Sequence, residues 1–221
     1  MNIAENILKH SLRNVYFLVG TACGGKTTAA RALCEKYGFL HFNDNWHEES
    51  FRVYRSICSE KYQRHSAAKR ETTDWEAFFS RSAGEFLADS GGRGEYDEYL
   101  EYAIIELIKL SQARTVVADV CAPIPLLTEI SEYNRIACLL APPELVTCAY
   151  YGSRADHKDF LDCILSLKEP EKKIAVQDEL FRIGVEKVFA QVREHNLFSI
   201  VRGGESTAEG TLKLLEEHFN L

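Results

Sequence analysis

The sequence predicts an α/β fold in which helices cover both faces of a five-stranded parallel sheet. Two observations support this prediction. Short apolar runs recur along the chain and are near-continuous rather than alternating, which is typical of strands buried on both faces. The segments between them carry apolar residues at helical spacing, and alternating strands and helices form right-handed parallel units. The expected strands are 14–20, 38–43, 115–120, 135–141 and 197–202.

Helical segments are marked by their apolar stripes and by their ends. Gly38 is expected to end the helix that follows the first strand, because glycine readily adopts the left-handed conformation of that position. Two further segments begin with residue pairs at capping-box spacing, Thr73 with Glu76 and Ser206 with Glu209. The expected helices are 27–37, 73–92, 95–110 and 206–219.

The amino-acid composition limits the class of protein and the partners that we expect. The chain has 221 residues, 46% of them hydrophobic and 27% charged, which suits one domain, 1–221. The formal net charge of -7 speaks against nucleic acid as a partner, because binding to a phosphate backbone uses a basic face. The seven cysteines are odd in number, none are spaced as C-x-x-C, and most lie in apolar runs, so we expect small, buried, reduced thiols. With no secretory signal and no run of about 18 apolar residues, we expect a cytoplasmic protein without membrane contact.

The segment GTACGGKT, residues 20–27, matches the phosphate-loop (P-loop) pattern G-x-x-x-x-G-K-[ST] between a strand and a helix. Glycines let backbone N–H groups turn toward a phosphate, and the helix N-terminus adds partial positive charge. Lys26 would contact the β- and γ-phosphates of ATP, Thr27 would bind Mg²⁺, and Thr28 is suited to the α-phosphate. Cys23 is either a tolerated small side chain or a redox-sensitive one. The expected nucleotide-binding residues of this loop are Gly20, Ala22, Cys23, Gly24, Gly25, Lys26, Thr27 and Thr28.

A carboxylate follows the third expected strand. Asp119 would reach Mg²⁺ directly or through water, and would share the metal with Thr27; the alternative is a structural strand-end acid. The next residue is Val120, so the second acid that many motor and transporter ATPases use is missing. The chain also has no N-K-x-D motif, which speaks against a GTPase.

With the P-loop and this order of elements, the chain resembles the nucleoside monophosphate kinase and shikimate kinase group of P-loop proteins. The resemblance implies a three-layer P-loop NTPase fold with strand order 2-3-1-4-5. It also implies an inserted helical lobe at 44–114 that holds the phosphate acceptor. The resemblance further implies a lid at 150–175 and a loop after the fifth strand that contacts the base of the nucleotide.

The same resemblance suggests roles for four further residues. Asp44, directly after the second strand, would orient an acceptor hydroxyl and take its proton, or it caps the next helix. Arg154 and Arg182 would stabilise charge on the transferred phosphoryl group, or they are solvated surface residues. The lid of the family carries two close arginines, whereas here only Arg154 is present, with Lys158 nearby. Arg202 would stack on adenine.

These features favour an ATP-dependent kinase of a small metabolite that bears a hydroxyl or a phosphate. The alternative is a nucleotide-binding regulator or slow ATPase, in which the aromatic residues at 75–102 contact a protein partner. Their helical spacing equally suits packing within the lobe itself. The acceptor and the oligomeric state are left open by the sequence.

Overall fold

The computed structural model of the chain describes residues 5–43, 74–90, 94–152, 155–204 and 206–221. All five expected strands form, each slightly shorter than expected, and every pairing is parallel. Their order in the sheet is β2-β3-β1-β4-β5, which confirms the expected order 2-3-1-4-5. The strands are β1 (Val15–Gly20), β2 (Leu40–Asn43), β3 (Val116–Asp119), β4 (Ile136–Leu140) and β5 (Ser199–Val201).

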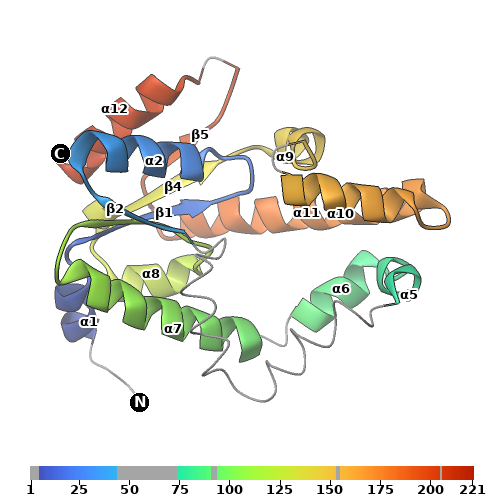
Figure 1. Ribbon diagram of the computed structural model, residues 1–221, viewed down its shortest axis with the longest axis horizontal. Coiled ribbons are helices and arrows are strands. Elements are labelled where there is room, and N and C mark those ends of the chain that lie inside the picture. Colours follow the sequence, from blue (N-terminus) through green and yellow to red (C-terminus); the bar gives the residue numbers. More distant parts are fainter. Residues whose placement is uncertain (1–4, 44–73, 91–93, 153–154, 205) are drawn as a thin grey trace.

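Helices lie on both faces of the sheet, so the fold has three layers (Figure 1). Successive residues of β1 point to opposite faces, as a strand requires: Phe17 joins one buried cluster and Leu18 the other. Helices α2 and α12 pack on one face, and α1, α7, α8 and α11 on the other. These helices are α1 (Glu5–Ser11), α2 (Lys26–Tyr37), α7 (Gly94–Ser111), α8 (Ile124–Ile130), α11 (Pro170–Glu194) and α12 (Ala208–Phe219).

In the described part of the chain, four further helices belong to the two long connections, which join β2 to β3 and β4 to β5. They are α5 (Trp75–Phe79), α6 (Ala83–Ser90), α9 (Pro143–Ala149) and α10 (Ala155–Leu165), and a 3₁₀ turn spans Tyr133–Arg135. In Figure 1, α5, α6 and α10 extend beyond the end of the sheet where β1 runs into α2. Both connections are therefore helical in the parts that the structure describes, as the sequence predicts. None of the described helices is both long and apolar enough to cross a membrane.

One expected helix is broken. The described part of the segment 73–92 forms α5 and α6, with a turn between them. Ser82 begins α6 with a capping box, in which its N–H donates to the Glu85 carboxylate over 2.8 Å and its hydroxyl accepts from the Glu85 N–H over 3.3 Å. This local capping competes with a continuous helix and ends it. Asp74, rather than Thr73, caps α5 by accepting from the Ala77 N–H over 3.0 Å; Thr73 lies outside the described residues.

The start of α12 also differs from the expectation. Thr207, not Ser206, is its N-cap and accepts from the Gly210 N–H over 3.0 Å. Ser206 instead accepts from the Gly203 N–H over 2.8 Å. The other expected end is confirmed, since Gly38 adopts φ 70° after α2.

The six described cysteines are free thiols, and Cys58 lies outside the described residues. Cys138 is buried in β4, and this burial raises its pKa to about 12. Cys121 and Cys148 are exposed, so the expectation of buried thiols is wrong for these two.

Candidate functional site

Two glycines let the P-loop lie directly against the end of β4. A Cβ atom at Gly20 would lie 2.1 Å from the Leu139 carbonyl oxygen, and one at Gly24 would lie 2.2 Å from the same atom. Gly20 also adopts φ 124°, a conformation that is essentially restricted to glycine. The Thr21 N–H donates to that carbonyl over 3.2 Å. The main chain of β4 thus leaves no room for a side chain at position 20 or 24.

Thr21 and Lys26 hold the loop in shape. The buried Thr21 hydroxyl accepts from the Ala141 N–H over 2.6 Å, which pins the loop to the residue after β4. The Lys26 ammonium donates to the Thr21 carbonyl over 2.7 Å and closes the loop on itself. Thr21 lies at a position of the motif that accepts any residue, so the motif does not indicate its role.

Helix α2 begins at the loop with its N-terminus uncapped by any side chain. Gly25 is the N-cap residue, with φ 94°, and the first turn of α2 has no acidic residue. The first N–H groups of a helix have no intrahelical partner and carry partial positive charge, so they favour an anion. Thr28, in this first turn, is exposed. The loop and α2 therefore offer the donors that a phosphate group needs.

Thr27 and Asp119 are brought together by the sheet order. Asp119 ends β3, pairs in register with Leu18 of β1, and is 3% exposed. The Thr27 hydroxyl donates to its Oδ2 atom over 2.6 Å. A hydroxyl that donates its proton keeps its oxygen lone pairs for another ligand. Thr27 is consequently in a state that suits metal binding.

The oxygen atoms of Thr27 and Asp119 fit Mg²⁺, which prefers hard oxygen ligands. In the part of the chain that the structure describes, no three His, Cys, Asp or Glu side chains group together closely enough to hold a metal ion. Mg²⁺ usually takes one or two protein ligands and completes its shell with phosphate oxygens and water. The donor set thus suits a metal that arrives with a nucleotide rather than one held by protein alone.

Two side chains of β2 also face Asp119. The Asn43 amide donates to Asp119 Oδ2 over 3.3 Å, and His41 Nε2 lies 3.9 Å from the same oxygen. Neither residue was predicted from the sequence as part of the site. Only the pairing of β2 with β3 brings them beside Asp119, and no local motif indicates it.

Arg202 contacts the P-loop. Its Nη1 donates to the Cys23 carbonyl over 2.8 Å, although the residue is exposed. Cys23 itself has φ 57°, which is costly for a residue other than glycine, about 1–2 kcal/mol. The contact links the end of β5 to the part of the loop with this unusual backbone.

Of the three other predicted site residues, only Arg182 lies within the described part of the chain. Arg182, on an exposed part of α11, lies 3.9 Å from the Glu144 carboxylate of α9. Among the described residues, no contact joins it to the P-loop. Asp44 and Arg154 lie outside the described residues.

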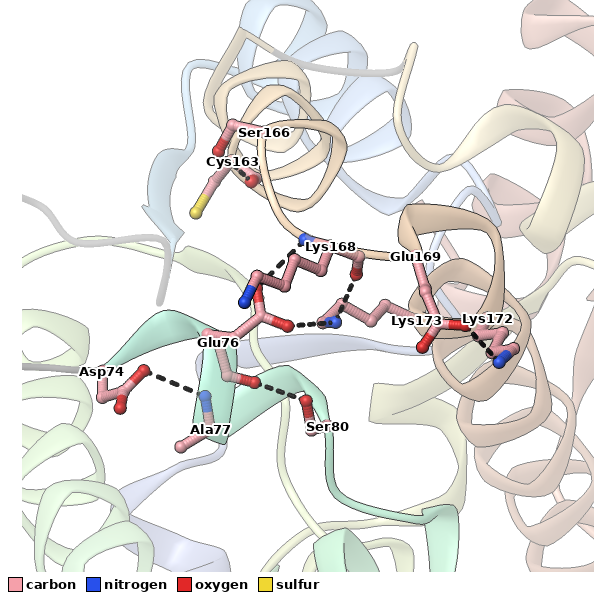
Figure 2. A network of polar contacts seen from close by, with 10 residues as sticks. All are labelled: Asp74, Glu76, Ala77, Ser80, Cys163, Ser166, Lys168, Glu169, Lys172 and Lys173. Atoms are coloured by element: carbon pink, nitrogen blue, oxygen red, sulfur yellow. Dashed lines mark hydrogen bonds and ion pairs between the residues drawn. The ribbon is translucent and has the colours of Figure 1, made fainter.

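A polar network joins the inserted lobe to the region expected to be the lid (Figure 2). Glu76 of α5 accepts from the Lys173 ammonium of α11 over 2.7 Å and from the Lys168 N–H over 3.0 Å. Lys173 is almost fully buried, and its hydrogen bond holds the pKa of Glu76 below its ordinary value. Beside this network, Phe79 of α5 packs against Phe160 of α10, with ring centroids 5.2 Å apart.

No protein-family model matches the chain, and no curated protein matches its sequence. Two solved shikimate kinase structures are similar to it. The structure from Bacteroides thetaiotaomicron has 15% identity and a TM-score of 0.41, over 94% of this chain and 98% of that one. The structure from Acinetobacter baumannii, in complex with shikimate, has 17% identity and a TM-score of 0.45, over 93% of each chain. The fold assignment rests on the strand order and P-loop geometry of this chain itself.

Proposed function

We propose that the chain is a Mg²⁺- and ATP-dependent phosphotransferase that acts on a small metabolite bearing a hydroxyl or a phosphate group. The contact of 2.6 Å between the Thr27 hydroxyl and Asp119 is the observation that carries this proposal. It joins the residue after Lys26 to the carboxyl end of β3, and ligands of parallel α/β sheets bind at this edge. A hydroxyl held by a buried carboxylate beside a lysine is the arrangement that a Mg²⁺-bound triphosphate needs.

The residues of the loop would act by positioning and by charge neutralisation. Lys26 would exchange the Thr21 carbonyl for phosphate oxygens, a stronger partner for an ammonium group. The N–H groups of the loop and of the first turn of α2 would bind the β-phosphate. Mg²⁺, bound beside Thr27, would supply charge neutralisation between the β- and γ-phosphates. Thr27 would keep its hydrogen bond to Asp119 throughout.

The acceptor side is assigned to the two helical regions beyond the sheet. In this proposal the lobe at 44–114 binds the acceptor and the region at 150–175 closes over the reacting groups. The ion pair between Glu76 and Lys173 supports a joint movement of the two regions, because α5 cannot leave α11 without exposing a buried ammonium group. Asp44 as the acceptor-orienting acid is part of the same proposal.

The proposed roles of the three arginines differ in their support. The contact of Arg202 with the Cys23 carbonyl supports a role next to the phosphates and the loop, in addition to the proposed stacking on adenine. Arg182 would have to leave Glu144, and an exposed pair separated by 3.9 Å is weak enough to allow that. Arg154 keeps its proposed role as the lid cation on the strength of its sequence position alone.

The regulator alternative depended on aromatic residues forming a partner surface. Phe79 is 1% exposed and its ring contacts those of Trp75 and Phe78 within 6 Å. Tyr102 is 9% exposed. Phe79 and Tyr102 thus pack inside the molecule, whereas Trp75 is 37% exposed. Because two of these aromatic residues are buried, the support for a partner-binding surface is reduced and we prefer the kinase.

The test uses the full-length chain and the variant Lys26→Ala. ATP binding is measured by calorimetry, and ADP release is measured with a coupled assay across a panel of hydroxyl- and phosphate-bearing metabolites. We expect one metabolite to accelerate ADP release at least tenfold. Lys26→Ala should weaken ATP binding by about tenfold to a hundredfold, because a hydrogen bond to a charged group contributes about 1.5–3 kcal/mol. Lys36→Ala, in the last turn of the same helix, is the matched control and should bind ATP normally.

The outcomes separate the two functions. ATP binding with no acceleration by any metabolite would favour the regulator. If Lys26→Ala binds ATP as tightly as the unchanged chain, the P-loop does not hold the nucleotide and the proposal fails.

A further inference from the structure

The strongest unexplained feature of the site is the concentration of contacts on one oxygen atom of Asp119. The Thr27 hydroxyl, the Asn43 amide and the His41 imidazole all approach Oδ2, at 2.6, 3.3 and 3.9 Å. None of the contacts seen among the described residues involves the other carboxylate oxygen. Three groups from two separate elements thus fix the rotation of one buried carboxylate.

The sheet explains how β2 supplies two of these groups. Asn43 pairs in register with Asp119, and His41 pairs with Val117. Residues two apart in a strand point to the same face, so both β2 side chains lie on the face toward which the carboxylate is turned. Because β3 lies between β2 and β1, Asp119 has β2 on one side and β1, which leads into the P-loop, on the other.

The His41 ring has a further property that packing alone does not account for. Its Nε2 atom is buried and makes no hydrogen bond with the described residues. A buried polar atom without a partner destabilises the folded state, so such an atom calls for a functional or structural reason. A movement of about 1 Å would bring Nε2 from 3.9 Å to hydrogen-bond distance of Oδ2.

We infer that Asn43 and His41 are positioning residues that hold the Asp119 carboxylate in the orientation in which it accepts the hydrogen bond from the Thr27 hydroxyl. They thereby set the affinity for nucleotide-bound Mg²⁺. With Oδ2 fixed, the Thr27 proton has a defined acceptor and its lone pairs have a defined direction. Removing a group that orients a metal ligand through a hydrogen bond typically changes the metal affinity tenfold to a hundredfold. The inference rests on the proposed function, since it requires Mg²⁺ to bind together with the nucleotide.

The test separates metal-dependent from metal-independent binding. Calorimetry with a non-hydrolysable ATP analogue is done in Mg²⁺ and in EDTA, on the full chain and on His41→Phe, Asn43→Leu and their combination. These substitutions keep the approximate volume and remove the polar atoms. Asn14→Leu is the matched control, because it removes a similar part-buried amide bond, to the Ser111 carbonyl over 3.1 Å, elsewhere in the chain.

We expect the double variant to lose about tenfold or more of the tightening that Mg²⁺ gives to the unchanged chain, with its affinity in EDTA unaltered. Asn14→Leu should keep the full tightening. The inference is wrong if the double variant keeps that tightening within twofold, or if it loses affinity equally in Mg²⁺ and in EDTA. The single variants decide the matter if the double variant melts below the assay temperature. If the unchanged chain shows no tightening with Mg²⁺, the proposed function fails and the inference fails with it.

Discussion

Replacing Gly20 by alanine should destabilise the protein strongly, although only one methyl group is added. The new Cβ would lie 2.1 Å from the Leu139 carbonyl oxygen, so reaching an ordinary contact of 3.4 Å requires a shift of 1.3 Å. That carbonyl belongs to β4, which is hydrogen-bonded between β1 and β5 and cannot move freely. The overlap should cost about 1–3 kcal/mol. The φ of 124° should add about 1–3 kcal/mol for a residue with a side chain.

Urea unfolding measures this effect against a matched substitution. Gly184 lies on the exposed side of α11, and an added Cβ there meets nothing within 4 Å. Gly184→Ala should therefore stabilise the chain by about 0.5–1 kcal/mol, since alanine is the better helix former. Gly20→Ala should lose about 2–6 kcal/mol, a large part of the 5–15 kcal/mol typical of a domain. A loss below about 1 kcal/mol with nucleotide binding intact would refute the close packing of loop and strand.

Three further predictions concern the site and its support. Thr27→Val should destabilise the nucleotide-free chain by about 1.5–3 kcal/mol in urea unfolding, because it removes a hydrogen bond to the buried Asp119 carboxylate; Thr27→Ser should restore most of that loss. Arg202→Met should weaken ATP binding about twofold to tenfold, measured by calorimetry, while the melting temperature stays nearly constant, since the contact with Cys23 is exposed. The stability difference between the unchanged chain and Glu76→Gln should depend on pH. The pKa of Glu76 is lowered in the folded state from its ordinary value of 4.5. The stability difference should therefore reach its maximum at pH values above 4.5 and shrink as the pH falls below it. A stability difference that is constant from pH 3 to 7 would contradict this.

The strands and the P-loop could be predicted because their signals are local. A strand buried on both faces is apolar throughout, and all four residues of β3 are buried despite the acid at its end. The P-loop is defined by consecutive residues whose backbone roles depend on glycine. Gly20 and Gly24 show the reason directly, since main chain occupies the space of a side chain at both positions.

The helix break and the helix starts could not be predicted because neighbouring residues compete for the same cap. Thr207 and Ser206 are both good N-cap residues, and the sequence does not show which hydroxyl reaches the helix. Ser82 and Glu85 form a capping box inside a continuous apolar stripe, so the stripe hides the end of one helix and the start of the next. Glu76 was interpreted as part of a local cap, whereas it pairs with a residue 97 positions away.

Helix α11 connects the two ends of the proposed site. Phe181, like Ala22 and Cys23 of the P-loop, packs against the buried cluster of Ala141, Val146 and Val185. Eight residues earlier, about 12 Å along the helix axis, Lys173 bonds Glu76 of the inserted lobe. A rigid helix cannot change the distance between these two contacts, so a shift of α11 on nucleotide binding would move α5 or break an ion pair whose ammonium group is buried. The two substrates of the proposed reaction would therefore influence each other through one helix.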